Sequence, residues 1–218
     1  MSGLTITTDH GKLSATFNLP DNAHCALLLA HGAGADHKHV HMENLAGAFA
    51  SAGIATLRFN FPFKEQGRNR VDSKFVSIDC IVNAVETLHA ETKLPVFAGG
   101  HSYGGRMVTH AVADNLIDCC GLILCSFPLH PAGKPGADRA AHFPEIKQSV
   151  LFLSGTRDAL ADSALLSEQV AKLSGPTKLH WLDTADHSFK VLKRTRKVEM
   201  DVYEEAAGIA ASFTVAAL

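Results

Sequence analysis

An apolar run that leads through glycines into a serine constrains this chain more than any other segment. Val96–Gly100 has the composition of a buried strand, and His101, Ser102, Tyr103 and Gly104 follow it before a stretch with helical spacing. A strand, a tight turn and a helix in this order place the serine hydroxyl at the end of the strand, where solvent reaches it. The glycines at both ends of the turn let the strand and the helix pack closely. The chain must therefore build its core around a buried strand with a helix directly beside it.

Further apolar runs alternate with segments of helical spacing. The expected strands are a hairpin of Leu4–Thr8 and Lys12–Leu19, followed by runs over residues 25–30, 54–59, 96–100, 122–125, 150–155 and 178–182. The expected helices cover residues 42–52, 73–90, 103–115, 163–173 and about 197–217. Such alternation favours right-handed crossovers and strands that are buried on both faces. We therefore expect an α/β fold with a mostly parallel eight-stranded sheet and helices on both faces.

The length and composition fit one domain. The chain has 218 residues, of which 46% are hydrophobic, and no repeat or Gly/Ser-rich linker divides it. A folded chain of this size exposes roughly 9,700 Å² of surface, so we expect a single domain over residues 1–218. The connection over residues 126–147 carries four prolines and supports at most a short helix. It is too short for a lid domain, and we expect an open site without a large lid.

Charge and cysteine content exclude several classes of partner. The formal net charge is −2, so neither nucleic acid nor an anionic membrane is an expected partner. The longest apolar stretches fall short of the roughly 20 residues of a membrane span, and the N-terminus lacks the features of a signal peptide. Five scattered cysteines with no CxxC pair indicate a reducing compartment, and we expect a cytoplasmic protein.

Ser102 is the candidate nucleophile, and the groups that would stabilise an oxyanion come from two turns. The backbone N–H of Tyr103 stands at the start of the expected helix and would point at an oxygen bound beside Ser102. A second donor is expected from the loop after the strand over residues 25–30, which reads His-Gly-Ala-Gly-Ala from position 31. We favour Ala33 as this donor, with Gly34 as the alternative.

The acid and the base of a serine-based site are expected after later strands. Asp158 follows the strand over residues 150–155, whereas Asp162 stands where a helix should begin and is interpreted as its N-cap. His187 is the one histidine between the last strand and the last helix. It would take the Ser102 proton while Asp158 holds its other ring nitrogen. Asp183 and Asp186 lie close to His187 in the sequence and are not the preferred partners.

Together these segments resemble the α/β-hydrolase superfamily over nearly the whole chain. HGAGAD, GGHSYGGR, GTRDAL and DTADHSF stand in the order that the superfamily shows. RFNFPFKEQGR and CSFPLHPAGKP resemble a compact branch near dienelactone hydrolases, which includes testis-expressed hydrolase-like proteins and the hydrolase-like subunit of a chromatin acetyltransferase complex. The resemblance implies Ser102 as nucleophile, Asp158 as acid and His187 as base. Dienelactone hydrolases proper have a cysteine in place of Ser102, so their lactone substrate is not implied.

Several other residues are candidates for a substrate pocket. Several aromatic and apolar side chains near strand ends are candidates to line an acyl pocket at the carboxyl edge of the sheet: Phe61, Phe63, Tyr103, Phe127, Leu129 and His130. The loop over residues 64–74 carries a local charge of +2. It would suit a carboxylate-bearing substrate, but a solvated loop is the favoured interpretation.

Two clusters of charged or ligating residues have simpler interpretations. His37, His39 and His41 raise the hypothesis of a metal site, but the cluster lacks the spacing of a binuclear hydrolase and is interpreted as an exposed loop. Basic residues over 190–197 precede acidic residues, which is typical of a solvated helix face. No metal or other cofactor is expected.

The functional expectation is a serine hydrolase that cleaves a carboxylic ester, thioester or lactone of a small acyl substrate through an acyl-enzyme intermediate. The alternative, which rests on the branch resemblance, is a hydrolase-fold interaction protein with little or no turnover. Loss of a candidate catalytic residue would favour the alternative, and the sequence shows no such loss.

Overall fold

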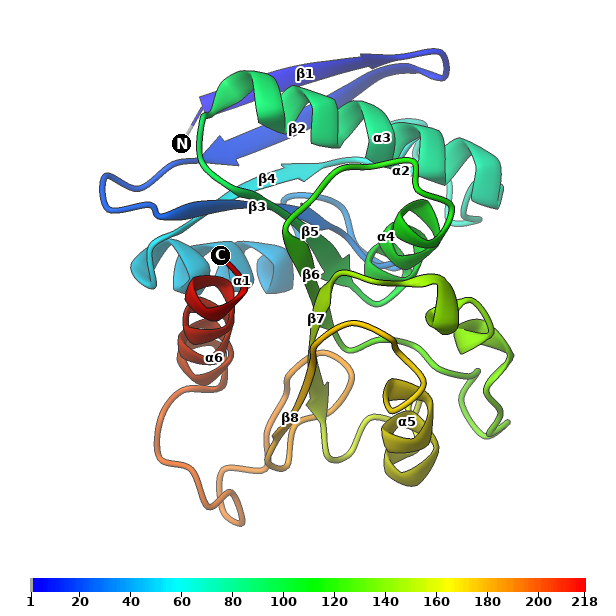
Figure 1. Ribbon diagram of the computed structural model, residues 1–218, viewed down its shortest axis with the longest axis vertical. Helices are drawn as coiled ribbons and strands as arrows, with labels where there is room; N and C mark the ends of the chain where they lie inside the picture. Colours follow the sequence, from blue (N-terminus) through cyan, green and yellow to red (C-terminus); the bar gives the residue numbers. More distant parts are fainter. Residues whose placement is uncertain (1) are drawn as a thin grey trace.

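The computed structural model describes residues 2–218 and contains one eight-stranded sheet (Figure 1). Its order is β1-β2-β4-β3-β5-β6-β7-β8; the pairs β1–β2 and β2–β4 are antiparallel and the others are parallel. The strands are β1 Ser2–Thr8, β2 Gly11–Asn18, β3 Cys25–Ala30, β4 Ile54–Phe59, β5 Val96–His101, β6 Gly121–Cys125, β7 Ser149–Gly155 and β8 Thr177–Leu182. The predicted mostly parallel sheet is confirmed.

Helices cover both faces of the sheet (Figure 1). On one face, α1 Val40–Ser51 and α6 Val202–Ala217 pack over a core that contains Leu27, Leu29 and Phe213. On the other face, α3 Lys74–Glu91, α4 Tyr103–Ala113 and α5 Ser163–Val170 cover a larger core. The central strands β3, β4, β5 and β6 are buried along their whole length because both of their faces are covered. Their near-continuous apolar sequences follow from this double burial.

The sheet order changes direction at β3, which pairs with β4 on one side and β5 on the other. The chain leaves β3 through α1 to reach β4, and then returns through α3 to β5 on the opposite side. In open α/β sheets a crevice forms outside the carboxyl ends of the strands at such a switch point. The loop after β3 and the turn after β5 flank this crevice, and they carry the HGAG and GHSYG segments.

The connection from β6 to β7 adds little structure over the sheet. It contains two single-turn 3₁₀ helices, Asp138–Ala140 and Phe143–Glu145, and a four-residue helix, α2 Pro62–Glu65, lies in another loop. Phe143 is buried against Phe127 and Phe152, so the connection follows the core and builds no separate lid. The folded surface is 9646 Å², close to the expected roughly 9,700 Å² for a chain of this size.

Two sequence expectations are corrected by the fold. The last helix begins at Val202, five residues later than about Lys197, because Asp201 caps it by accepting a hydrogen bond from Tyr203 N–H at 2.8 Å. The basic residues over 190–197 therefore lie in a loop, where the Arg196 guanidinium is buried and pairs with Glu205. The DHKHVH segment is only partly exposed, since His37 and His41 are buried.

The three histidines of this segment make separate contacts. His37 hydrogen-bonds Asn60 at 2.8 Å, and His41 hydrogen-bonds the Tyr203 hydroxyl at 2.9 Å. His39 caps α1 by accepting a hydrogen bond from His41 N–H at 3.2 Å. Within residues 2–218, no three His, Cys, Asp or Glu side chains come together as metal ligands would. Across the same residues, no helix combines the length and apolar character that a membrane crossing requires.

Glycines allow the backbone around β5 to pack without side chains between its neighbours. A Cβ at Gly100 would lie 2.3 Å from the Ala30 carbonyl oxygen, and a Cβ at Gly104 would lie 2.5 Å from the same oxygen. Both distances are shorter than van der Waals contact allows. Strand β5 and helix α4 therefore approach β3 as closely as they do only because these positions lack side chains.

A pair of glycine substitutions tests this packing. Gly104→Ala should lower the free energy of unfolding by about 3 kcal/mol or more, because the added methyl group meets the backbone of β3. Gly208→Ala, in α6, meets no neighbouring atom and should raise the free energy of unfolding by about 0.4–1 kcal/mol. Urea denaturation of the two variants measures both changes. Equal stability of the two variants would contradict the packing described here.

Candidate active site

Ser102 occupies a strained turn at the carboxyl end of β5. Its φ of 52° and ψ of −116° lie in a region that side-chain-bearing residues rarely adopt. The turn is held from below, because Ser102 N–H donates a hydrogen bond to the Cys125 carbonyl on β6 at 2.9 Å. Tyr103 then starts α4. The strained conformation turns the Ser102 side chain away from the core and toward the crevice.

A hydrogen-bonded chain links Ser102, His187 and Asp158. His187 Nε2 lies 2.8 Å from Ser102 Oγ, and His187 Nδ1 lies 2.9 and 2.8 Å from the two Asp158 carboxylate oxygens. A carboxylate only accepts hydrogen bonds, so His187 Nδ1 carries a proton, and in the neutral ring the lone pair of Nε2 faces the serine hydroxyl. The Asp158 side chain is fully buried, whereas the His187 side chain is 23% exposed. The predicted residues from three separate loops are thus brought together.

The structure also separates Asp158 from the other aspartates. Asp162 caps α5 by accepting a hydrogen bond from Leu165 N–H at 3.0 Å, as the sequence predicted. Asp183 accepts from Lys197 N–H, and Asp186 accepts from the N–H groups of Ser188 and Lys190. These carboxylates organise helix and loop termini, and only Asp158 among them contacts the His187 ring in the described chain.

The loops that carry Asp158 and His187 are joined along their backbones. Arg157 N–H donates to the Ala185 carbonyl at 2.9 Å, and Thr184 N–H donates to Thr156 Oγ1 at 2.8 Å. Gly155 makes this approach possible, since a Cβ there would lie 2.3 Å from the Ala185 carbonyl oxygen. The distance between Asp158 and His187 is therefore set by backbone contacts as well as by their own hydrogen bond.

His31 fixes the peptide that leads into Ala33. Its Nδ1 lies 2.8 Å from the Gly32 carbonyl oxygen, and its Nε2 accepts a hydrogen bond from Phe61 N–H at 3.1 Å. Because a carbonyl accepts and the amide donates, His31 is neutral with its proton on Nδ1. Burial against Phe61 and Phe63 lowers the pKa of His31 to about 4, which maintains this state.

This arrangement leaves two backbone amides free to act as donors near the serine. The Gly32 carbonyl and the Ala33 N–H belong to one trans peptide and point in opposite directions. Within residues 2–218, Ala33 N–H donates to no other group. Tyr103 N–H belongs to the first turn of α4, where amides have no partner inside the helix. Gly34 is more exposed than Ala33, and in the described part of the chain no hydrogen bond holds the carbonyl of the peptide that precedes it.

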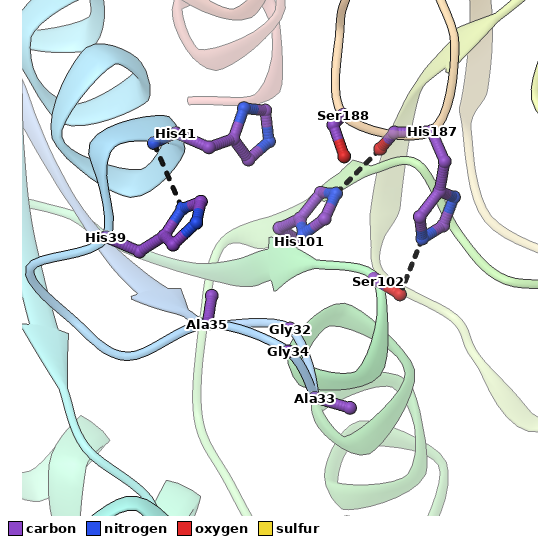
Figure 2. A pocket seen from close by; sticks show the side chains of 10 residues that line it. All are labelled: Gly32, Ala33, Gly34, Ala35, His39, His41, His101, Ser102, His187 and Ser188. Carbon is purple, nitrogen blue, oxygen red and sulfur yellow. Dashed lines mark hydrogen bonds between the residues drawn. The ribbon is translucent and has the colours of Figure 1, made fainter. Parts of the chain in front are cut away.

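A cavity of about 260 Å³ opens beside Ser102 and His187 (Figure 2). In Figure 2, the loop after β3 forms one wall, and imidazole side chains from the start of α1 and the end of β5 gather opposite it. Ten residues line the cavity: Gly32, Ala33, Gly34, Ala35, His39, His41, His101, Ser102, His187 and Ser188. None of them carries a carboxylate, an ammonium or a guanidinium group. Burial lowers the pKa of His41 to about 3 and that of His101 to about 4, so the deep imidazoles are neutral.

The residues expected to line an acyl pocket lie elsewhere. Phe61, Phe63 and Phe127 are completely buried in the core under α3 and α4, and Leu129 is 1% exposed. His130 is buried and accepts a hydrogen bond from Asp162 N–H at 2.9 Å. Leu129 and His130 border a different hollow of about 410 Å³. A position after a strand does not determine whether a side chain turns toward the crevice or back under the helices, and these side chains turn back.

The basic loop over residues 64–74 also lies apart from the cavity. Arg68 pairs with Asp72 at 2.5 Å, and Lys74 lies 3.7 Å from Asp114. Lys64 sits over the Phe63 ring at 5.5 Å from its centroid. No residue of this loop lines the cavity beside Ser102. The local positive charge is thus largely engaged by neighbouring groups.

Four histidines of the site were not predicted as parts of it: His31, which holds the Gly32 peptide, and His39, His41 and His101, which line the cavity. His31 and His101 directly precede Gly32 and Ser102 in the two motifs, so their positions beside the motifs were a usable signal. His41 gave no such signal, because its place beside His101 depends on how α1 packs against α6 and the sheet. The rings of His41 and His101 are 4.4 Å apart and nearly perpendicular.

Solved structures with the same fold come from several bacteria. A dienelactone hydrolase from Anabaena variabilis is 19% identical, with a TM-score of 0.78 over 99% of this chain and 96% of its own. Est1E from Butyrivibrio proteoclasticus, solved with ferulic acid, is 17% identical, with a TM-score of 0.75 over 98% and 99%. A serine hydrolase without a lid from Xanthomonas campestris is 19% identical, with a TM-score of 0.74 over 100% and 94%.

These similarities concern the fold, while the family follows from the sequence. The model of the alpha/beta hydrolase domain family matches residues 23–215, which include every residue of the hydrogen-bonded chain and both candidate oxyanion donors. The match leaves out the β1–β2 hairpin and the last residues of α6. By the sheet order, the strained serine turn and this match, the chain belongs to the alpha/beta hydrolase family.

Proposed function

We propose that this protein is a serine hydrolase that cleaves a carboxylic ester, thioester or lactone of a small acyl substrate. The observation that supports this most strongly is the hydrogen-bonded chain Ser102–His187–Asp158, with 2.8 Å between the serine oxygen and the imidazole nitrogen. Nucleophile, base and orienting acid at these distances form the arrangement that activates a serine hydroxyl. Solved structures that share the fold include proteins described as esterases, which agrees with this chemistry.

In the acylation step, Ser102, His187 and Asp158 each have a separate role. Ser102 Oγ attacks the substrate carbonyl carbon while His187 Nε2 takes the hydroxyl proton, which gives a tetrahedral oxyanion. Buried Asp158 keeps the proton on Nδ1 and stabilises the imidazolium that forms. His187 then gives its proton to the departing alcohol or thiol, and the acyl group remains on Ser102.

Deacylation repeats the sequence with water in place of the alcohol. Water gives a proton to His187 and attacks the acyl carbon, and the acid leaves as the proton returns to Ser102. In both steps the Ala33 and Tyr103 amides would bind the oxyanion, because they are the free backbone donors that flank Ser102. This assignment requires no metal or cofactor for the reaction.

The cavity supports a small and uncharged acyl group. One wall consists of glycine and alanine residues without long side chains, namely Gly32, Ala33, Gly34 and Ala35. The opposite wall consists mainly of imidazoles. A charged group that entered it would lose hydration without meeting an opposite charge. An interaction protein without turnover would not require the strained Ser102 conformation, so the structure does not favour that alternative.

Replacement of the nucleophile tests the proposal directly. Ser102→Ala should abolish hydrolysis of p-nitrophenyl acetate, with a loss of kcat of about 10⁶-fold, as for other serine hydrolases. Ser167→Ala, on the exposed face of α5, serves as the matched control and should retain wild-type kcat. Turnover that is equal in the two variants would show that the activity does not depend on Ser102.

The choice of acid is tested by two identical substitutions. Asp158→Asn should lower kcat by about 10⁴-fold, because an amide favours the wrong tautomer of His187. Asp162→Asn should leave kcat unchanged, because asparagine is an equally good N-cap for α5. Steady-state kinetics with the same ester compare the two variants. Equal activity of the pair would contradict the assignment of Asp158.

A third test concerns His31, which holds the loop over residues 31–35 that carries Ala33 and is called the oxyanion loop here. His31→Leu removes one of the two hydrogen bonds to the Gly32 carbonyl and leaves the one from Ala35 N–H at 3.1 Å, and kcat should fall by about 10²-fold, as when one oxyanion donor is lost. His31→Asn places an amide nitrogen near the position of Nδ1 and should retain more of the activity. A His31→Leu variant that is folded by circular dichroism and fully active would show that the loop needs no such support.

A further inference from the structure

His101 directly precedes Ser102 in the chain. Its side chain reaches across the site to the loop over residues 183–192, which carries His187 and is called the base loop below. Its Nε2 lies 2.8 Å from the backbone carbonyl oxygen of His187, and the dashed line in Figure 2 marks this contact. The two ring centroids are 5.1 Å apart. His101 is therefore bonded to the main chain of the same residue whose side chain contacts Ser102.

The protonation state of His101 follows from its partners. A carbonyl oxygen only accepts, so Nε2 carries the proton and donates it. Burial lowers the pKa of His101 to about 4, so Nδ1 is unprotonated near neutral pH. Nδ1 has no hydrogen-bond partner in the described chain and faces Gly32, where a Cβ would lie only 2.8 Å away. The ring thus touches the base loop with one nitrogen and the oxyanion loop with the other.

These contacts close a ring of bonds around the reacting atoms. The peptide bond joins His101 to Ser102, Ser102 Oγ meets His187 Nε2, and the His187 carbonyl returns to His101 Nε2. This closed series of bonds therefore fixes both the side chain and the main chain of His187 relative to Ser102. Each of the two hydrogen bonds measures 2.8 Å.

His41 supports the His101 ring from behind. Its ring stands 4.4 Å from that of His101 at 70°, and its Nδ1 is bonded to the Tyr203 hydroxyl at 2.9 Å. It also packs edge to face on Phe189, which follows His187 in the base loop. His101 consequently has little room to turn away from the His187 carbonyl.

The remaining contacts of the base loop run in other directions. The Asp186 carboxylate accepts hydrogen bonds from the N–H groups of Ser188 and Lys190 within the loop. The Ala185 carbonyl accepts one from Arg157 N–H, which lies in the loop after β7. Among the hydrogen bonds of the described residues, the bond from His101 is the one that ties this loop to β5, the strand that ends directly before Ser102. Removal of the bond would allow His187 to shift relative to Ser102 while the loop kept its internal structure.

We propose that His101 is a positioning residue that sets the distance between His187 and Ser102 by donating from Nε2 to the His187 carbonyl, while its other edge packs on Gly32. This role rests on the proposed serine hydrolase function. It concerns the geometry of proton transfer, so it should affect the chemical step more than substrate binding.

Two amide substitutions separate this role from a general need for a side chain. His101→Gln carries its amide nitrogen about as far along the side chain as Nε2, whereas His101→Asn carries it at the level of Nδ1 and cannot reach the carbonyl. With p-nitrophenyl acetate, kcat of His101→Asn should fall by about 10²-fold with KM changed less than about threefold. His101→Gln should recover at least about tenfold of this loss. Hydrogen exchange of peptides over residues 183–192 should be faster in the asparagine variant than in the glutamine variant.

The outcomes distinguish the two proposals. If wild-type protein hydrolyses the ester but the Gln and Asn variants have equal kcat, whether high or low, the positioning role is wrong. If wild-type protein shows no Ser102-dependent hydrolysis, the proposed function is wrong. In that case hydrogen exchange still decides whether the bond exists, because equal exchange in the two variants would overturn it and faster exchange in the asparagine variant would support it.

Discussion

The structure depends on the close approach of β5 and α4 to the backbone of β3. Gly100 and Gly104 both face the Ala30 carbonyl at distances that exclude a side chain. The chain between them reverses direction so sharply that Ser102 takes a left-handed conformation. Such strain persists only where the surrounding structure imposes it, and here the sheet below and the helix beside the turn impose it. The position of Ser102 at the edge of the crevice is thus a consequence of how the core packs.

The same approach brings the other parts of the site within reach. Because β3 lies next to β5, the loop that follows β3 passes directly over the serine, with Gly32 near both His101 and Ser102. Because β6, β7 and β8 follow in order on the other side, the loops after β7 and β8 supply Asp158 and His187 from that direction. Ser102 therefore stands between the loop that carries Gly32 and Ala33 on one side and the pair of Asp158 and His187 on the other.

Burial divides the histidines of the site by role. His31, His41 and His101 are enclosed without a carboxylate partner, so burial lowers the pKa of each and they serve as neutral hydrogen-bonding groups. His187 has different surroundings: its Nδ1 contacts the carboxylate of Asp158, and its side chain keeps some exposure to solvent. The chain has 13 histidines, and within residues 2–218 His187 is the one whose ring is hydrogen-bonded to both a serine hydroxyl and a carboxylate.

The sequence predicted the sheet well, and it named the three residues that the structure brings within hydrogen-bond distance, because both follow from local patterns. The apolar runs over residues 25–30 and 54–59 coincide with β3 and β4 to the residue, since strands buried on both faces have sharp compositional limits. Asp158 and His187 could be chosen because each follows a strand whose end meets the same edge of the sheet. Asp162 was separable from Asp158 by its place before a helix.

The cavity could not be predicted because it depends on contacts between distant segments. Phe61 and Phe127 have strand-end positions like those of site residues, but their side chains turn into the core under α3 and α4. His41 joins the site through the packing of α1 on α6 and β4, which places its ring beside that of His101. The start of α6 was misplaced because Asp201 caps the helix within a stretch whose composition does not change sharply.

The central claim is that His187 activates Ser102 as a nucleophile, and covalent labelling tests it most directly. Purified protein is treated with a fluorophosphonate, digested, and examined by mass spectrometry to locate the adduct. The account predicts one adduct, on Ser102, that is absent from a His187→Ala variant with an unchanged circular dichroism spectrum. A folded wild-type protein that remains unlabelled, or one labelled equally well without His187, would contradict it.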